Sequence, residues 1–379
     1  MKMNRFVFYP VGQGLFYAGQ LGCRPYAPFY RSFIFDCGGE EPYIGDAVAR
    51  FVKETAYDNI FLCVISHLHK DHYNGLALLK NKGVSIDKIV LPYLPHKYTA
   101  LKFVYIVGQY FSDSQNLTVN EDDLTNIRLM SKFYHIQELS DDDRSFCRNV
   151  IMDFEERKIQ NGFNYFHSVK TFGHYDENFV VELYNKAITD EKWEEFNQKL
   201  SDYLEKEGIV NIFELFPNKI EDLVKIYKAV FAKNLNITSI VMKHYLQGRT
   251  FGYYPVQDSR FMLSDGYRFF NCPHVFERLN KNVTVLTGDA EFDKILQQRI
   301  FEDEPSISVL QVPHHGAITN WNKMKLPRNV ECKLVIPYGL GNKYNHPNCE
   351  VVKDILKMQN CELISVTQST QYEYLIKTI

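Results

Sequence analysis

The stretch that decides the fold runs from Ile60 to His72 and reads Ile-Phe-Leu-Cys-Val-Ile-Ser-His-Leu-His-Lys-Asp-His. Its first half is a continuous apolar run, typical of a β-strand covered on both faces. In the extended segment that follows, His67 and His69 point the same way, so both can reach one cation. Asp71 and His72 begin the next predicted helix and can face a second cation. The sequence therefore predicts a metal site at a strand-to-helix turn.

Further apolar runs on both sides of this stretch predict an α/β fold. Short aromatic or β-branched runs predict strands at 6–9, 32–36, 60–66, 88–92, 238–242, 283–289, 308–312, 333–337 and 363–366. Helical patterns predict helices at 45–56, 71–80, 291–300 and 349–358.

Residues 97–236 differ from the rest of the chain. They contain one of the 14 prolines and four of the 20 glycines, and charged helical patterns recur in them. The segment carries 17 Lys and Arg against 24 Asp and Glu, a net charge of −7, whereas the remainder has a net charge of +4. We expect a mostly helical insertion at 97–236 that separates two halves of one domain, 1–96 and 237–379.

Composition excludes several classes of protein. The chain has 379 residues, a net charge of −3, 28 Phe and 25 Tyr, enough apolar surface for a folded core. It contains neither a membrane-spanning apolar run nor a signal peptide at its start. The eight Cys are scattered without a Cys-x-x-Cys pair, which argues against a disulfide scaffold and a zinc ribbon. A cytoplasmic protein without a membrane partner is expected.

Four other motifs follow predicted strands or lie close to one. They are Ser32-Phe-Ile-Phe-Asp36-Cys-Gly38, Leu286-Thr-Gly-Asp289, Val312-Pro-His314-His315-Gly316 and Gly341-Asn342-Lys-Tyr344-Asn-His346-Pro347. With the His-x-His-x-Asp-His stretch, they resemble the signature of the metallo-β-lactamase superfamily of binuclear metallohydrolases. The last two motifs and Val11-Gly-Gln-Gly14 resemble one branch, which contains the hydrolase domain of the ComEC-type DNA-uptake channel and the teichoic-acid phosphorylcholine esterases. The resemblance covers the first and last hundred residues and leaves out the insertion.

This resemblance implies a four-layer αββα sandwich with two metal ions at the edge of its sheets. It implies that one ion is held by His67, His69 and His315, the other by Asp71, His72 and His346, with Asp289 bridging the two. His314 is the alternative to His315 as the ligand, and otherwise faces the substrate. Asp36 either supports a metal-binding imidazole or caps a turn. Imidazoles with a carboxylate bridge suit Zn²⁺ and also allow Mn²⁺.

The function expected from this pattern is hydrolysis of phosphodiester bonds in nucleic acid or nucleotides through a metal-bridged hydroxide. Asp71, Asp289 and His314 are the candidate catalytic residues, and Asn342 and Tyr344 are candidate donors to a phosphate oxygen. Two alternatives stay open. The same centre can hydrolyse ester, thioester or lactam bonds of a small molecule. The chain can also be a non-enzymatic interaction module, whose 97–236 insertion recruits a protein partner or mediates self-association.

Overall fold

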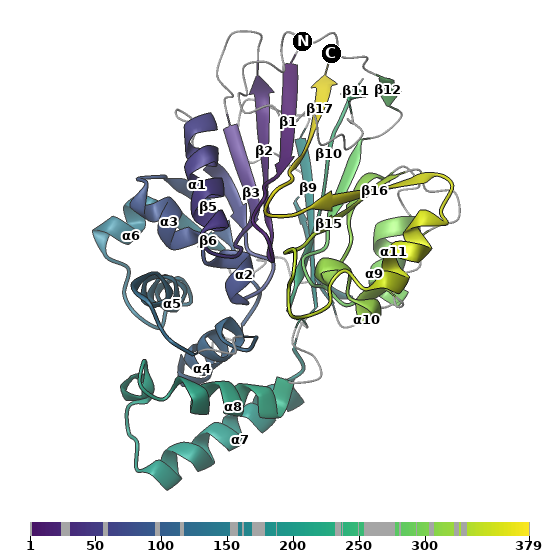
Figure 1. The fold of residues 1–379 in the computed structure, drawn as a ribbon. Coiled ribbons are helices and arrows are strands. Elements are labelled where there is room, and N and C mark those ends of the chain that lie inside the picture. The colour runs from purple at the N-terminus through teal and green to yellow at the C-terminus, as the bar shows by residue number, and fades with distance from the viewer. Residues whose placement is uncertain are drawn as a thin grey trace.

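The structure is a computed structural model. It describes residues 2–23, 31–55, 60–94, 99–113, 117–151, 158–160, 163–168, 179–186, 188–231, 236, 238–248, 250–253, 277–279, 282–292, 294–302, 307–321, 326 and 332–378. Two mixed β-sheets with helices around them form the described part of the chain, which confirms the predicted α/β class (Figure 1).

The first sheet joins the two ends of the chain. Its nine described strands lie in the order β12 (Glu277–Leu279), β11 (Thr250–Tyr253), β17 (Tyr372–Thr378), β1 (Lys2–Phe8), β2 (Phe16–Cys23), β3 (Arg31–Cys37), β4 (Ile60–Val64), β5 (Ile86–Val90) and β6 (Cys147–Ile151). The strands from β12 to β3 pair antiparallel, and those from β3 to β6 pair parallel. The carboxyl ends of β3 and β4 therefore meet at one edge of the sheet.

The second sheet has its own group of parallel strands. Among the described residues its eight strands lie in the order β16 (Cys361–Val366), β15 (Cys332–Pro337), β14 (Ile307–Gln311), β13 (Val283–Leu286), β10 (Ile240–Leu246), β9 (Phe179–Lys186), β8 (Phe163–Ser168) and β7 (Lys158–Gln160). Strands β13 to β16 are parallel, and the others pair antiparallel. The carboxyl ends of β13, β14 and β15 thus also share one edge.

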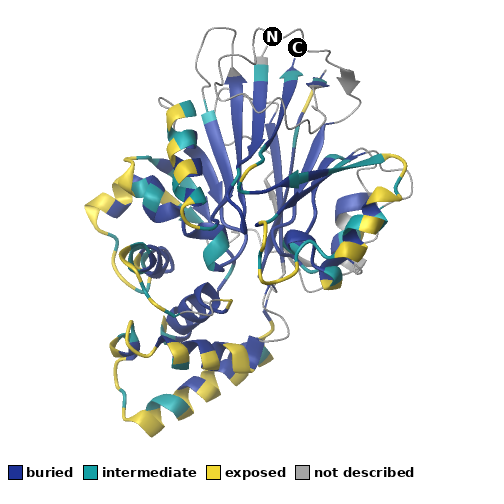
Figure 2. Ribbon diagram, in the orientation of Figure 1, coloured by how far each residue is buried: buried dark blue, intermediate teal, exposed yellow. Residues whose placement is uncertain are grey.

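The two sheets pack face to face through an aromatic core. Phe33 of the first sheet contacts Phe179 and His244 of the second, with ring centroids 5.0 and 5.3 Å apart. A chain of buried polar contacts crosses the same interface: the hydroxyl of Tyr17 lies 2.8 Å from Nε2 of His244 and 2.7 Å from the hydroxyl of Tyr374. The described central strands of both sheets, such as β3, β4, β10 and β13, are accordingly buried, whereas β6 and β16 are partly accessible (Figure 2).

Helices cover the outer face of each sheet. One hydrophobic cluster joins the first sheet to α1 (Tyr43–Glu54), α3 (Leu76–Asn81), α4 (Thr99–Tyr110), α5 (Glu121–Phe133), α6 (Asp141–Phe146), α7 (Asp190–Glu207), η1 (Ile212–Leu215) and α8 (Ile220–Phe231). Another joins the second sheet to α9 (Lys294–Gln297), the π-helical turn Gln298–Glu302, α10 (Ile318–Trp321) and α11 (Cys349–Leu356). Helix α1 shows the cause, because its apolar Ile44, Val48 and Phe51 recur at helical spacing and are all buried.

The predicted helix at 71–80 is wrong, because it is interrupted. Helix α2 (Lys70–Tyr73) ends before Asn74, and α3 starts at Leu76. The side chain of Asn74 accepts a hydrogen bond from Gly39 N and donates one to Gly39 O, and Gly75 N donates to Cys37 O. These bonds to the loop after β3 replace the ones that would continue the helix.

The segment 97–236 contributes strands as well as helices. Strand β6 pairs with β5 in the first sheet, and β9 pairs with β10 in the second. We expected a mostly helical insertion here, but β7, β8 and β9 belong to the second sheet. The segment is therefore part of both sheets.

Among the described residues, no helix is both long and apolar enough to cross a membrane.

Candidate metal centre

The His-x-His-x-Asp-His stretch lies at the carboxyl end of β4, where the chain turns into α2. His67, His69 and His72 are at most 3% exposed, whereas the side chain of Asp71 is 29% exposed. Nε2 of His67 lies 3.0 Å from Nδ1 of His69, within hydrogen-bonding distance, so the two imidazoles are adjacent. The buried imidazoles line the floor of the site, and Asp71 lies at its mouth.

Two glycines allow the backbone to approach the metal-binding loop. A Cβ atom on Gly38 would lie 2.3 Å from the carbonyl carbon of Asp71. Gly14 has a φ of +134°, and a Cβ there would lie 2.5 Å from the carbonyl oxygen of Asp71. That same oxygen accepts a hydrogen bond from Leu15 N. The Val11–Gly14 loop therefore supports the backbone of Asp71.

Asp36, at the end of β3, contacts the imidazole of His72 and the residue before His67. Its Oδ2 lies 2.7 Å from Nδ1 of His72 and accepts a hydrogen bond from the hydroxyl of Ser66 at 2.6 Å. Its Oδ1 accepts from Ser66 N at 2.6 Å. Because Nδ1 of His72 is engaged in this way, Nε2 is the nitrogen that can bind an ion.

Asp289 lies between the imidazoles, directly after β13. Its Oδ1 is 3.4 Å from Nε2 of His72, and its Oδ2 is 3.6 Å from Nε2 of His67. Gly288 allows this approach, since its φ is +50° and a Cβ there would lie 2.7 Å from the side chain of Ser66. Asp289 thus connects the nitrogens of two imidazoles, a position compatible with a bridging carboxylate.

His314 and His315, in a single turn (η5, His314–Gly316) after β14, have different surroundings. His315 is buried, and its Nδ1 donates to Pro337 O at 2.8 Å, so Nε2 faces Asp71 Oδ2 at 3.5 Å and Asp289 Oδ1 at 3.8 Å. The side chain of His314 is 30% exposed, and its Nε2 lies 3.6 Å from Asp289 Oδ2. His315 therefore fits a ligand better, and His314 fits a group that faces the substrate.

Backbone strain is concentrated at this site. Five described residues other than glycine have a positive φ, and four of them belong to the site: Asp36, His314, His315 and Asn345. A residue with a Cβ is held there at a cost of about 1–3 kcal/mol. Such strain is common where side chains must be aimed at a ligand.

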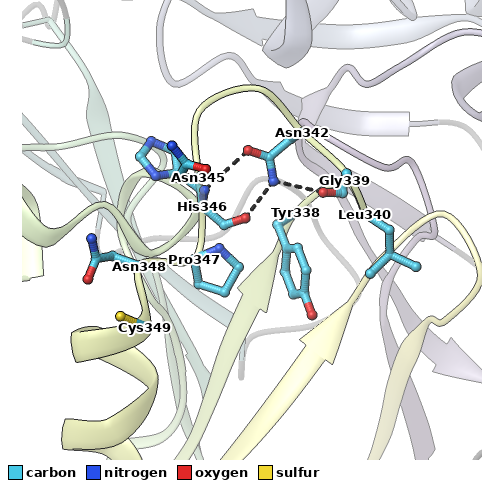
Figure 3. A pocket seen from close by; sticks show the side chains of 10 residues that line it. Tyr338, Gly339, Leu340, Asn342, Asn345, His346, Pro347, Asn348 and Cys349 are labelled. Carbon is cyan, nitrogen blue, oxygen red and sulfur yellow. Dashed lines mark hydrogen bonds between the residues drawn. The ribbon is translucent and has the colours of Figure 1, made fainter.

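The loop after β15 carries the last predicted ligand. His346 is half-buried, and its ring lies 5.3 Å from the ring of His314. Asn342 organises this loop: it donates to Gly339 O and His346 O and accepts from His346 N (Figure 3). Its side-chain oxygen also accepts from Tyr344 N. Asn342 is therefore a structural residue of the loop.

This loop also lines a pocket of about 370 Å³, formed by residues 338–342 and 345–349.

Ligand-capable atoms converge in two groups. His67, His72 and Asp289 form one, and Asp71, His72 and His315 form the other, each with its atoms within 4.8 Å of one another. A tetrahedral ion with bonds of about 2.0–2.2 Å separates its ligands by about 3.3–3.6 Å. The distances from Nε2 of His72 to Asp289 and from Nε2 of His315 to Asp71, 3.4 and 3.5 Å, match this value.

This grouping differs from the expected one. His315 lies with Asp71 and His72, whereas we expected it with His67 and His69. His69 and His346 lie close by but belong to neither group. The reason is the turn at His314 and His315, whose left-handed backbone directs the second imidazole toward the mouth of the site, where Asp71 lies.

Charges in the site strongly influence one another. Burial alone would raise the pKa of Asp289, but His314, His72 and His67 hold it well below its usual value. Burial alone would lower the pKa of His72, but Asp289, Asp36 and Asp71 raise it well above its usual value. Burial and the charge of His72 lower the pKa of His67 well below its usual value. The site thus balances imidazoles against carboxylates.

Three residues that no sequence motif singled out also contact the candidate site. Nδ1 of His314 lies 3.2 Å from Nδ2 of Asn236 and 3.1 Å from Oδ1 of Asn320. Asp113 reaches the site from the end of α4, with Oδ2 3.8 Å from Nδ1 of His69. None of the three belongs to a recognisable sequence motif. Only Asn320 lies close in sequence to a predicted site residue, six residues after His314.

No protein-family model and no curated protein matches this chain. What the site can do is therefore inferred from its own residues.

Proposed function

We propose that this chain is a divalent-metal-dependent hydrolase of phosphodiester bonds, with the four-layer αββα sandwich of the metallo-β-lactamase superfamily. Two sheets packed face to face with helices on both outer faces support this fold. The order of the motifs along the chain and their position at the carboxyl ends of β3, β4, β13, β14 and β15 support the family.

The observation that carries the proposal is a set of buried atoms that lack a well-formed hydrogen bond. Among the described residues, Nε2 of His72, Nε2 of His315 and Oδ1 of Asp289 are buried without such a partner. Leaving a buried polar atom unsatisfied costs about 1–3 kcal/mol. Each of the three atoms lies within 3.4–3.8 Å of an ionisable side chain of the site, so cations held by the two ligand groups would satisfy all three. Imidazole with carboxylate suits Zn²⁺ and allows Mn²⁺.

Divalent ions bound here would stabilise negative charge on a phosphate and lower the pKa of a water molecule. The protein supplies the rest. Asp36 fixes the ring of His72, Pro337 O fixes that of His315, and Asp289 lies between the two groups. His314 is exposed enough to meet a substrate, and Asn320 and Asn236 hold its Nδ1, so its Nε2 is placed to pass a proton to a leaving group.

The mouth of the site favours small substrates over long nucleic acid. Burial raises the pKa of Tyr344, and the carboxylates of Asp113, Asp71 and Glu40 raise it further. Lys343, with Nζ 5.1 Å from the centroid of the Tyr344 ring, offsets part of this charge, and the carboxylates in excess of it would disfavour a long polyanion. The same observation favours the second candidate, a hydrolase of ester, thioester or lactam bonds in a small molecule.

The test is a comparison of substrates on one protein preparation loaded with Zn²⁺ or Mn²⁺. We expect hydrolysis of bis-p-nitrophenyl phosphate, weaker cleavage of single-stranded DNA, and loss of both in Asp71→Ala and His69→Ala. Asp141→Ala, an exposed carboxylate of α6, is the matched control. Turnover of a lactam or thioester without any phosphodiesterase activity would instead establish the second candidate.

We further propose that the protein acts in the cytoplasm, a reducing compartment that is compatible with cysteine side chains kept as thiols. Sγ of Cys332 and Sγ of Cys361 lie 3.9 Å apart on paired strands, joined by a hydrogen bond and not by a disulfide.

A further inference from the structure

Asp113 lies beside the metal centre but comes from a different part of the chain. It follows α4, and its Oδ2 is 3.8 Å from Nδ1 of His69. That nitrogen is also 3.0 Å from Nε2 of His67, so the carboxylate faces the pair of nitrogens predicted to share an ion. The side chain of Asp113 is 44% exposed, which leaves it free to move the few tenths of an ångström that coordination needs.

The backbone of Asp113 is held by the loop that carries His346. Its carbonyl oxygen accepts a hydrogen bond from Nζ of Lys343 at 2.9 Å and from the hydroxyl of Tyr344 at 3.2 Å. Asp113 thus contacts two loops of the site: its carboxylate faces the loop of His69, and its backbone carbonyl binds the loop of Lys343 and Tyr344.

The helices around Asp113 are fixed to the metal-binding loop by a buried carboxylate. Asp123 of α5 is 1% exposed, and its Oδ1 lies 2.7 Å from Nζ of Lys70, inside the His-x-His-x-Asp-His stretch. The same Oδ1 accepts from the hydroxyl of Tyr110, three residues before Asp113. The position of Asp113 relative to the imidazoles is therefore built into the fold.

A second set of hydrogen bonds fixes α5 to the residues that follow the His-x-His-x-Asp-His stretch. Nδ2 of Asn126 donates to Asn74 O at 2.9 Å, and its Oδ1 accepts from Ala77 N at 3.1 Å. Together with the contact of Asp123, these bonds hold α5 in place beside the site.

We propose that Asp113 is a carboxylate ligand of the cation held by His67 and His69. This inference rests on the proposed function, because it requires the metal centre. His67 and His69 supply two nitrogens, and Asp289 Oδ2, 3.6 Å from His67, supplies one oxygen. Asp113 completes a four-ligand set with a second oxygen. Two oxygens make the set harder, and therefore more suitable for Mn²⁺ than one of imidazoles alone.

The test measures metal binding rather than activity. Co²⁺ is titrated into the wild type, Asp113→Ala, Asp113→Glu and the exposed control Asp141→Ala, and its visible absorption and its affinity in competition with a chelator are recorded. We expect Asp113→Ala to change the absorption spectrum and to weaken one of two Co²⁺ sites at least tenfold. We expect Asp113→Glu to restore part of both, and Asp141→Ala to match the wild type.

The outcomes separate this inference from the proposed function. A wild type that binds two ions, with Asp113→Ala indistinguishable from it in spectrum and affinity, overturns the role of Asp113 and leaves the hydrolase proposal standing. A wild type that binds no Co²⁺ overturns both. Far-UV circular dichroism of each variant verifies that it is folded, which we expect because Asp113 is exposed.

Discussion

Oδ2 of Asp36 lies 2.7 Å from Nδ1 of His72, and neither side chain is exposed to solvent. Asp36 has a φ of 54°, which is a strained conformation for a residue with a Cβ. Holding Asp36 in this contact therefore costs some stability of the folded state. The contact fixes the orientation of the imidazole and leaves Nε2 facing Asp289. An acid in one motif thus aims a ligand in another, 36 residues later in the chain.

Replacing Asp36 by Asn should weaken metal binding. Asp36 receives three hydrogen bonds, from Ser66 N, the hydroxyl of Ser66 and Nδ1 of His72. Asn offers one oxygen, so its amide nitrogen would face a donor, and the negative charge beside His72 would be lost. We expect about a 10–100-fold loss of affinity for Zn²⁺, measured by competition with a chelator. Asp46→Asn, on the exposed side of α1, is the control; an equal affinity in both variants would show that Asp36 does not support the ligand.

Replacing His314 and replacing His315 should affect metal content and hydrolysis rate differently. His315→Ala removes a buried Nε2 from the group with Asp71 and His72, so we expect one metal ion fewer per chain. His314→Ala removes an exposed ring that lies outside both groups, so we expect unchanged metal content and a rate of hydrolysis at least tenfold lower. Metal analysis and initial rates on the same samples check both. The opposite pattern would make His314 the ligand.

Gly38→Ala should disturb the metal-binding loop. The new Cβ would lie 2.3–2.4 Å from backbone atoms of Asp71 and His72, which cannot be avoided without moving that backbone. We expect a loss of about 1–3 kcal/mol in the free energy of unfolding, measured with urea, and weaker metal binding. Gly45→Ala, in α1 with nothing within 4 Å of the new Cβ, should instead be neutral or stabilise by up to about 1 kcal/mol. Similar effects at both positions would contradict the close approach at Gly38.

Much of the site was predictable, because its residues follow strands. His67, Asp289 and His314 each come directly after a run of apolar residues, and the structure has β4, β13 and β14 there. Parallel strands bring their carboxyl ends to one edge, so local patterns were sufficient to indicate which side chains would meet. The α/β class followed from the same runs.

The rest depends on tertiary contacts that no local pattern encodes. Asp113 is an isolated acid in an acidic segment, and its place beside His69 results from the packing of α4 and α5. Strand β9 (Phe179–Lys186) was missed because charged helical patterns dominate its surroundings, and its pairing with β10 and β8 depends on tertiary structure. The grouping of His315 with Asp71 depends on a left-handed turn that the sequence His-His-Gly permits but does not specify.

Buried His244 should make the protein less stable in mild acid. Burial between the sheets lowers its pKa to about 3, below the value of about 6.5 in the unfolded chain. The unfolded state therefore binds more protons below pH 6.5, so the stability that neutral His244 contributes is complete above pH 6.5 and is lost as the pH falls toward 3. The loss approaches about 1.4 kcal/mol per pH unit.

A variant without this imidazole isolates the effect. His244→Phe keeps the contacts with the rings of Phe6 and Phe33 and removes the titrating group. We expect the free energy of unfolding in urea to fall less between pH 6.5 and 5 in this variant than in the wild type, by roughly 1–2 kcal/mol. Equal slopes for the two proteins would show that His244 takes up no proton on unfolding.

The metal content of the purified chain tests the central claim most directly. Inductively coupled plasma mass spectrometry is applied to protein prepared without chelators, for the wild type and for Asp289→Ala, which removes the carboxylate between the two ligand groups. We predict close to two zinc or manganese ions per wild-type chain and fewer than one in the variant. A wild type with almost no bound metal after incubation with Zn²⁺ or Mn²⁺ would contradict this prediction.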